Sequence, residues 1–299
     1  MELVLPDAEI ERLLTPWVHE ELPPTGDRWR EQVRLLDAKA GRQKRKGGWR
    51  ALLGFRRATA QVRNEYDKTI WPEYDLANRL RPKGDAVPLV WGNRTFLAGD
   101  MATKRVHLLA LMRVIAALRP RRVLEVGSGV GFNLLALAPR FPEIHFTGLE
   151  LTAAGVAAAR AACAAPLPPA LFEFAPEPLT APDAVRAIEW VEADAAKMPF
   201  ADASFDLVFT ALALEQVESI RARALAEVAR VSSGHVAMVE PFRDWNADGA
   251  RRALIVGKEY FAASIADLAA YGMEPELVIA NMPTKLAMGV GLVLARVKR

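Results

Sequence analysis

The sequence predicts an α/β fold in which helices cover both faces of a doubly wound, mostly parallel sheet of seven strands. Three observations carry this prediction. From residue 119 onward, short apolar runs alternate with helix-length segments, which is the pattern of a parallel sheet. A loop with three glycines follows the first of these runs, at residues 127–131. Acidic residues stand where the next strands end, at Glu150 and Asp194.

The first 102 residues lack this alternation and are predicted to form a helical cap that contributes to a substrate site. Apolar residues within 7–21 recur at helical spacing, namely Ile10, Leu13, Leu14, Trp17 and Val18. A second helix is expected at 27–40, further helices at 58–81 and a short extended segment at 87–97. A helix at 101–118 then leads into the first strand. We therefore divide the chain into a cap, 1–102, and a ligand-binding domain, 103–299.

The glycine loop lies in the segment 122–133, Arg-Val-Leu-Glu-Val-Gly-Ser-Gly-Val-Gly-Phe-Asn. It reads as a buried strand, a turn and the start of a helix, whose free N–H groups would face a ligand lying on the glycine backbone. The spacing is G-x-G-x-G. The dinucleotide-binding fingerprint would require a glycine at position 132, which is Phe132. Glu125, two residues before the loop, would repel a pyrophosphate and attract a cation.

This loop resembles the first motif of the class I S-adenosylmethionine-dependent methyltransferases, acid-x-G-x-G-x-G. The resemblance implies a Rossmann-like methyltransferase fold over roughly residues 103–299, with S-adenosylmethionine as the cofactor. That molecule carries a sulfonium and an ammonium and no phosphate, so an acid beside it is chemically reasonable. The resemblance also assigns cofactor contacts to the loop, at Glu125, Gly127, Ser128, Gly129 and Gly131.

The acids at the next strand ends fit the same family. There, an acid after the second strand binds both ribose hydroxyls, which here would be Glu150, followed by Leu151. An acid after the third strand reaches the adenine amino group and the next backbone N–H meets a ring nitrogen, which here would be Asp194 and Ala195. Thr210 ends the fourth strand, within a segment at 204–216 that resembles the family's fourth motif.

The remaining elements complete the predicted sheet. Strands are expected at 122–126, 144–149, 187–192, 204–210, 234–240, 276–280 and 289–297, the last one antiparallel. Helices are expected at 131–140, 153–165, 217–231 and 258–271. The stretch from about 166 to 186 contains six prolines up to residue 182 and little periodicity. It is predicted to be an insertion that runs over the surface.

A basic segment lies in the cap between Arg28 and Arg63, with twelve Lys and Arg against two acids. Such a run is either a solvated stretch between helices or a surface for an anionic partner. That partner could be a phosphorylated or lipid-linked substrate, a membrane surface, or RNA.

Three residues are candidates for a catalytic base: Glu215 and Glu240, which follow strands at the active edge, and His107, for which a role in the core stays open. Further candidates for acceptor contact are Gln216, Arg243, Asp244, Trp245, Trp91, Asn93 and Arg94. We expect methyl transfer to an oxygen, or a nitrogen, of a polar and perhaps anionic small molecule such as a sugar or a lipid-linked metabolite. The alternatives are RNA methylation and cofactor binding without transfer.

The composition limits which kinds of site and which cellular location we expect. The single cysteine, Cys163, excludes an internal disulfide framework, and no Cys/His cluster has metal-ligand spacing. No apolar run reaches 18 residues, and residues 1–7 lack the features of a signal peptide. We therefore expect a cytoplasmic protein without a metal. The oligomeric state, including a homodimer, stays open.

Overall fold

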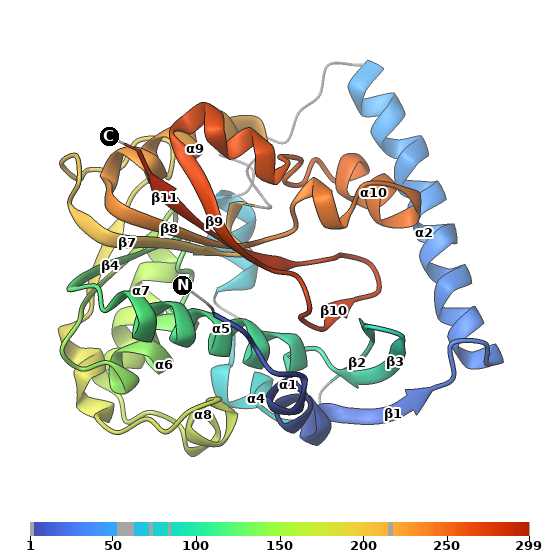
Figure 1. The fold of residues 1–299 in the computed structure, drawn as a ribbon, viewed down its shortest axis with the longest axis horizontal. Coiled ribbons are helices and arrows are strands. Elements are labelled where there is room, and N and C mark those ends of the chain that lie inside the picture. The colour runs from blue at the N-terminus through green and yellow to red at the C-terminus, as the bar shows by residue number, and fades with distance from the viewer. Residues whose placement is uncertain (1–2, 53–62, 72–73, 83–84, 215–217, 299) are drawn as a thin grey trace.

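The computed structural model describes residues 3–52, 63–71, 74–82, 85–214 and 218–298, the side chains of residues 46–52 excepted. Within them lie two sheets (Figure 1). The larger has seven strands in the order β6-β5-β4-β7-β8-β11-β9, and the smaller has four in the order β1-β3-β2-β10. The seven-stranded, mostly parallel sheet confirms the predicted fold class.

The seven-stranded sheet consists of β4 (Arg122–Val126), β5 (His145–Glu150), β6 (Glu189–Glu192), β7 (Phe205–Ala211), β8 (Ser232–Glu240), β9 (Met273–Ile279) and β11 (Gly291–Val297). Strands β4 to β8 run parallel, and β11 is antiparallel to both β8 and β9. The register places Val126 beside Thr210 and Glu150 beside Glu192. The carboxyl ends of four parallel strands therefore meet at one edge, where open α/β sheets bind ligands.

Alternate residues of each strand supply two separate cores. Val123 and Leu207 pack toward the helices α5 (Ala102–Leu118), α6 (Phe132–Arg140) and α7 (Ala153–Ala164). Leu124 and Val208 pack toward α9 (Arg221–Val231) and the 3-10 helix η7 (Ile265–Tyr271). Because each strand is apolar on both faces, it has to lie in the middle of a three-layer fold. Burying one such side chain fully stabilises the fold by about 1.5–3 kcal/mol.

The N-terminal region contains strands as well as helices, which corrects the predicted helix at 7–21. That segment forms α1 (Asp7–Leu14), a 3-10 turn η1 (Thr15–Trp17) and β1 (Val18–Leu22). Pro16 lies in the turn, where its missing N–H ends the helical hydrogen bonding. Strand β1 pairs with β3 (Arg94–Gly99), which forms a hairpin with β2 (Ala86–Trp91). Strand β10 (Thr284–Lys285) joins β2 from the other end of the chain.

The basic segment begins on one long helix, α2 (Asp27–Leu52), which extends twelve residues beyond the predicted end at Ala40. It runs beside α10 (Gly249–Gly257) at one side of the molecule (Figure 1). Gln43 Nε2 donates to the carbonyl of Gly257 at 2.6 Å, and a Cβ on Gly257 would lie 2.9 Å from the Gln43 carbonyl oxygen. This tertiary contact outweighs the weak helix propensity of Gly47 and Gly48. The helix predicted at 258–271 is found only in its second half, as η7, because α10 ends at Gly257 and residues 258–264 are not helical.

The sequence suggested that the proline-rich stretch is an insertion that runs over the surface. The structure instead packs part of it into the core. It contains α8 (Pro169–Phe174), with Leu171 and Phe174 buried, followed by the 3-10 helix η3 (Pro182–Ala187). The Arg105 guanidinium of α5 donates to the carbonyls of Phe174 at 2.8 Å and Leu13 at 2.7 Å. Burial lowers the pKa of Arg105 to about 10. Its hydrogen bonds join α8 and α1 to α5, so this stretch is part of the core.

Candidate active site

A cavity of about 440 Å³ opens at the carboxyl ends of β4 to β7, a size typical of small-molecule sites. The glycine loop and the ends of β5, β6 and β7 form one side. The other side comes from the N-terminal region and the start of α5, with Tyr66, Ile70, Trp71, Tyr74, Arg79, Met101 and Lys104. The sequence did not point to these seven residues as lining a site, because their segments carry no motif.

The glycine loop has left-handed backbone at all three glycines, with φ of 73°, 56° and 84° at Gly127, Gly129 and Gly131, which disfavours other residues there. Gly127 and Gly129 line the cavity. Gly131 does not, and a Cβ there would collide with the ring of Trp190. The third glycine thus permits tight packing of the loop on β6, while the first two leave the backbone open.

Glu125 is 2% exposed and lines the cavity. Its Oε1 accepts a hydrogen bond from Asn133 Nδ2 at 2.6 Å, and its Oε2 has no partner among the described residues. Burial raises the pKa of Glu125 to about 8, against the opposing effects of the Asn133 bond and the Lys104 charge. A buried carboxylate oxygen without a partner, facing a cavity, suits a cationic ligand.

Glu150 and Asp194 lie at the two neighbouring strand ends, and both line the cavity, as do Leu151 and Ala195. Glu150 Oε2 accepts from the Gly129 N–H at 3.0 Å, and Oε1 accepts from the hydroxyl of Thr152 at 2.6 Å. Asp194 is half-buried, and its Oδ1 accepts from the N–H of Ala196 at 2.8 Å. The structure therefore brings the three predicted acids together around one cavity.

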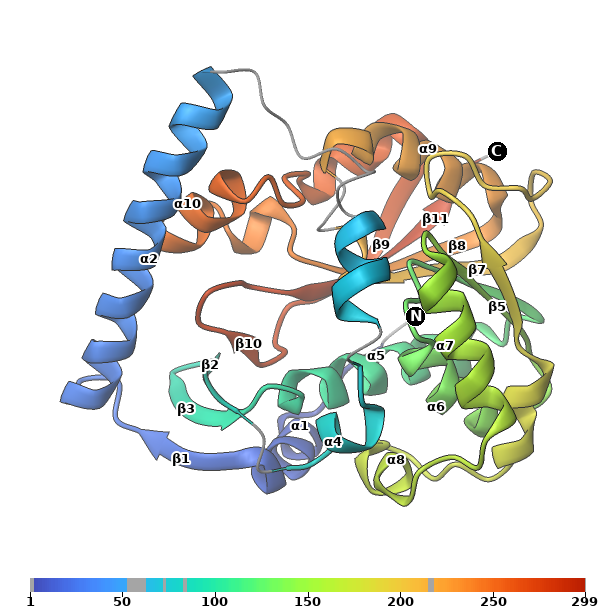
Figure 2. The same cartoon turned by 180° about the vertical axis from the view of Figure 1, so that it is seen from behind.

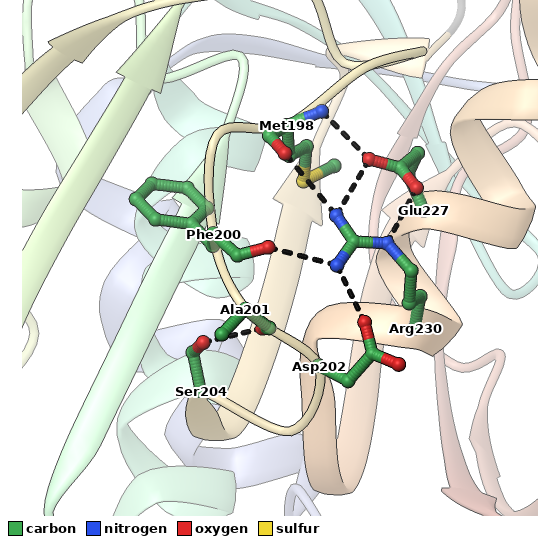
Figure 3. A network of polar contacts seen from close by, with 7 residues as sticks. All are labelled: Met198, Phe200, Ala201, Asp202, Ser204, Glu227 and Arg230. Atoms are coloured by element: carbon green, nitrogen blue, oxygen red, sulfur yellow. Dashed lines mark hydrogen bonds and ion pairs between the residues drawn. The ribbon is translucent and has the colours of Figure 1, made fainter.

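An arginine of α9 fixes the loop that follows Asp194 and Ala195 (Figure 3). Arg230 donates to both carboxylate oxygens of Glu227, to Asp202 Oδ1 at 2.7 Å and to the carbonyls of Phe200 and Met198 at 2.8 and 3.1 Å. Glu227 in turn accepts from the N–H of Met198 at 2.7 Å. The pKa of Glu227 is lowered, chiefly by its hydrogen bonds with Arg230. We missed this anchor from the sequence, although the Glu227 and Arg230 spacing of three residues was visible.

The turn after β7 lines the cavity with Ala211, Leu212, Ala213 and Leu214. Ser128 of the glycine loop also lines it, whereas Thr210 is fully buried behind it. Leu212 has a left-handed φ of 57°, a conformation that costs a non-glycine residue roughly 1 kcal/mol or more. The turn is thus held in its shape by its surroundings.

Glu240 provides part of that support. It is fully buried at the end of β8, and its Oε1 accepts from the N–H groups of Ala213 and Leu214 at 3.0 and 3.1 Å. Glu240 does not line the cavity. This placement favours a role in positioning the turn over direct proton transfer from an acceptor.

Of the other two candidate bases, one lies outside the described residues and the other is buried away from the cavity. Glu215, like Gln216, lies outside the described residues. His107 is buried on α5 and does not line the cavity. Burial, together with the charges of Lys104 and Lys285, lowers the pKa of His107 to about 3, so the ring is neutral at pH 7. The geometry offers no path for His107 to reach an acceptor in this cavity.

The remaining acceptor candidates also lie away from the cavity. Arg94 forms ion pairs with Glu21 and Glu11, and Trp91 Nε1 donates to the Asn281 carbonyl at 2.8 Å. Trp245 packs beneath β11, where its ring blocks any side chain at Gly291. The tip of the β2–β3 hairpin, with Asn93, and the loop with Arg243 and Asp244 likewise contribute no lining residue.

The comparisons with known proteins agree with this geometry. A family model described as a methyltransferase domain matches residues 124–238, the span from β4 to β8 that forms the glycine loop and the strand ends. This match, over less than half of the chain, supports a class I S-adenosylmethionine-dependent methyltransferase domain at these residues. The cofactor of these methyltransferases, S-adenosylmethionine, fits the residues present, because the unpartnered Glu125 Oε2 faces the cavity and suits a sulfonium or ammonium.

One curated protein that is similar to this chain is the malonyl-acyl-carrier-protein O-methyltransferase of Laribacter hongkongensis. It is 28% identical over 158 residues, which are 53% of this chain and 48% of that protein. The chain thus spans about half the length of this curated relative.

Two solved structures show the same fold. Magnesium protoporphyrin IX methyltransferase from Synechocystis PCC 6803, with bound SAH, has a TM-score of 0.52 at 10% identity over 81% of this chain and 100% of that one. The cyclase SpnF has a TM-score of 0.50 at 17% identity, over 81% of this chain and 97% of that one. Because a cyclase shares the fold, the acceptor chemistry has to be argued from the site.

The described residues contain no group of three or more His, Cys, Asp or Glu arranged to hold a metal ion. No described helix is both long enough and apolar enough to cross a membrane.

Proposed function

We propose that this methyltransferase transfers the methyl group of S-adenosylmethionine to an oxygen of an anionic small molecule, and that this oxygen belongs to a carboxylate. The observation that carries the proposal is that two cationic side chains, Arg79 and Lys104, line the same cavity as the glycine loop. An uncharged sugar, one of the polar acceptors that the sequence suggested, would give Arg79 no anionic partner.

The acceptor side of the cavity combines charge with aromatic surface. The Arg79 guanidinium lies 5.1 Å from the centre of the Tyr74 ring, and the Lys104 ammonium lies 5.5 Å from that of Phe132. Arg79 is exposed, and its described contact is with the ring of Tyr74. A compact acid with an apolar body would satisfy both features, because arginine binds carboxylates in a bidentate way.

The titratable groups support a carboxylate over an alcohol. An alcohol has to lose a proton to a base during the transfer, whereas a carboxylate is already ionised at pH 7. Burial raises the pKa of Tyr74 to about 12, which makes its hydroxyl a poor base. Among the described residues, the acids that line the cavity are Glu125, Glu150 and Asp194, and we assign all three to the cofactor.

When bound, S-adenosylmethionine supplies an electrophilic methyl group, so the new carbon–oxygen bond forms as the methyl–sulfur bond breaks and the sulfur keeps the electron pair. Arg79 and Lys104 would hold the acceptor oxygen in line for attack, and the aromatic walls would exclude water. The name of the curated relative, an O-methyltransferase, agrees with an oxygen acceptor.

The test measures labelled methyl transfer to a panel of carboxylic acids and to the matching alcohols and amines. We expect transfer to acids, and we expect Arg79→Gln to raise the acceptor KM about tenfold or more without changing the affinity for S-adenosylhomocysteine. The matched control is Arg81→Gln, an exposed arginine of the same segment that does not line the cavity. Transfer to alcohols alone, or an unchanged KM in Arg79→Gln, would refute the proposal.

The described basic residues of α2 are not part of the proposed acceptor site. Arg42, Lys44 and Arg45 of α2 do not line the cavity, so replacing them with Ser should leave the KM of a small acid unchanged. If the same variants lose RNA binding that is steeply salt-dependent, RNA becomes the better acceptor. Cofactor binding with no transfer to any member of the panel would favour a protein that binds the cofactor without turnover.

A further inference from the structure

Trp71 closes the cavity from the N-terminal side, outside the segment that the family model matches. It follows a π-helical turn, η2 (Tyr66–Ile70), in which the Trp71 N–H donates to the Tyr66 carbonyl at 3.0 Å. Asp67 fastens this turn to α7, because its Oδ1 accepts from the N–H of Ala154 at 3.1 Å. Figure 2 shows the turn beside the start of α7. Turns of this kind occur frequently at functional sites.

The indole lies against two glycines of the cofactor site. A Cβ on Gly129 would lie 2.8 Å from Trp71 Cη2, and a Cβ on Gly155 would lie 2.9 Å from Trp71 Nε1. Gly155 is in α7 and has no left-handed φ, so its conformation does not require glycine. The same Cβ would lie 2.8 Å from Glu150 Cγ. The indole N–H is therefore close to the carboxylate assigned to the ribose.

That N–H is a buried donor without a hydrogen-bond partner among the described residues. Trp91 provides the contrast within the same region, because its indole N–H donates to the carbonyl of Asn281 at 2.8 Å. A buried donor that is left unpaired destabilises a protein unless a ligand completes it. The oxygens of Glu150 accept from Gly129 and Thr152 and not from this N–H, so an acceptor within the cavity can complete it.

The rings of Tyr66 and Tyr74 hold the indole in place, with centroids 5.0 and 5.9 Å from that of Trp71. We propose that Trp71 is a cofactor-binding residue whose indole covers the ribose side of the cavity and whose N–H donates to a ribose oxygen of the bound cofactor. The N-terminal region thereby completes the cofactor site as well as the acceptor site. The role of Trp71 rests on the proposed binding of S-adenosylmethionine in this cavity. It does not depend on which acceptor is methylated.

The test is calorimetric titration with S-adenosylhomocysteine of the wild type, Trp71→Phe and Trp71→Ala, with Trp91→Phe as the matched control. Trp71→Phe keeps an aromatic ring and removes the N–H, so we expect about tenfold weaker binding. Trp71→Ala also loses the cover and should bind more weakly still, while Trp91→Phe should bind as the wild type does. Thermal unfolding without ligand shows whether each variant is folded.

A second measurement separates a hydrogen bond from a structural role. The same titrations are made with the 2′-deoxy and 3′-deoxy forms of S-adenosylhomocysteine. If Trp71 donates to one ribose hydroxyl, the difference between wild type and Trp71→Phe disappears for the analogue that lacks it. A difference that persists with both analogues would overturn the proposal, as would unchanged or tighter binding by Trp71→Ala. Failure of the wild type to bind at all would overturn the cofactor assignment itself.

Discussion

Replacing Glu240 distinguishes a positioning residue from a catalytic base. Its carboxylate accepts hydrogen bonds from the N–H groups of Ala213 and Leu214, in a turn that also contains the left-handed Leu212. Glu240→Gln keeps an oxygen that can accept both bonds and replaces the rest of the carboxyl group by an amide. Glu240→Ala removes the oxygen and leaves two amides without this partner.

The structure sets the size of each effect. A hydrogen bond to a charged group is worth about 1.5–3 kcal/mol and one between neutral groups about 0.5–1.5 kcal/mol. Glu240→Gln, which keeps both bonds, should therefore lower the free energy of unfolding by at most about 3 kcal/mol. Glu240→Ala leaves two donors unsatisfied at about 1–3 kcal/mol each, and it also opens a cavity. We expect a total loss of roughly 3–6 kcal/mol.

Urea unfolding of both variants measures these losses, with Glu189→Gln, an exposed acid on β6, as the control that should change by less than about 0.5 kcal/mol. In methyl-transfer assays with an accepted acid, Glu240→Gln should keep its rate within a few-fold and its pH profile unshifted. Loss of a base would instead cost about 10²- to 10⁴-fold. Such a drop in a stably folded Glu240→Gln, or equal destabilisation by Gln and Ala, would refute the positioning role.

Two further predictions concern pH. The raised pKa of Glu125, about 8, means that the free protein binds a proton there at pH 7, which a cationic cofactor displaces. Affinity for S-adenosylmethionine should therefore rise from pH 6 to 8 by up to about tenfold per pH unit, and calorimetry should find no such rise in Glu125→Gln. For His107, the folded pKa of about 3 lies below the ordinary 6.5 or so, so the unfolded chain binds more protons and stability falls as pH drops from 6.5 toward 3. Between pH 6.5 and pH 5 the free energy of unfolding should fall by roughly 2 kcal/mol because of His107. Urea unfolding midpoints should therefore fall less over this range in His107→Met than in the wild type. An equal fall in both proteins would show that His107 is not the cause.

The sequence allowed the cofactor side of the site to be predicted because its signals are local. Glu125, Glu150 and Asp194 lie within two residues of the end of a recognisable strand, and the carboxyl ends of parallel strands meet at one edge. The predicted bounds of β4, β5 and α7 agree with the structure to within one residue for the same reason. An apolar run followed by a polar strand end needs no knowledge of distant contacts.

The acceptor side could not be predicted, because distant parts of the chain build it. Arg79 and Trp71 reach the cavity only because the N-terminal region docks beside α7. The function of Glu240 depends on amides 26 and 27 residues earlier in the chain. Strand β1 was hidden because the spacing of Trp17 and Val18 also suits a helix, and only pairing with β3 decides it.

The measurement that tests the central claim most directly is calorimetric titration of the wild type and Glu150→Ala with S-adenosylmethionine. Glu192→Ala serves as control, because this exposed acid ends the neighbouring strand β6 and does not line the cavity. The account predicts one-to-one binding by the wild type and by Glu192→Ala, and a loss of at least about tenfold in affinity in Glu150→Ala. No binding by the wild type, or equal binding by a folded Glu150→Ala, would contradict the assignment of this cavity to the cofactor.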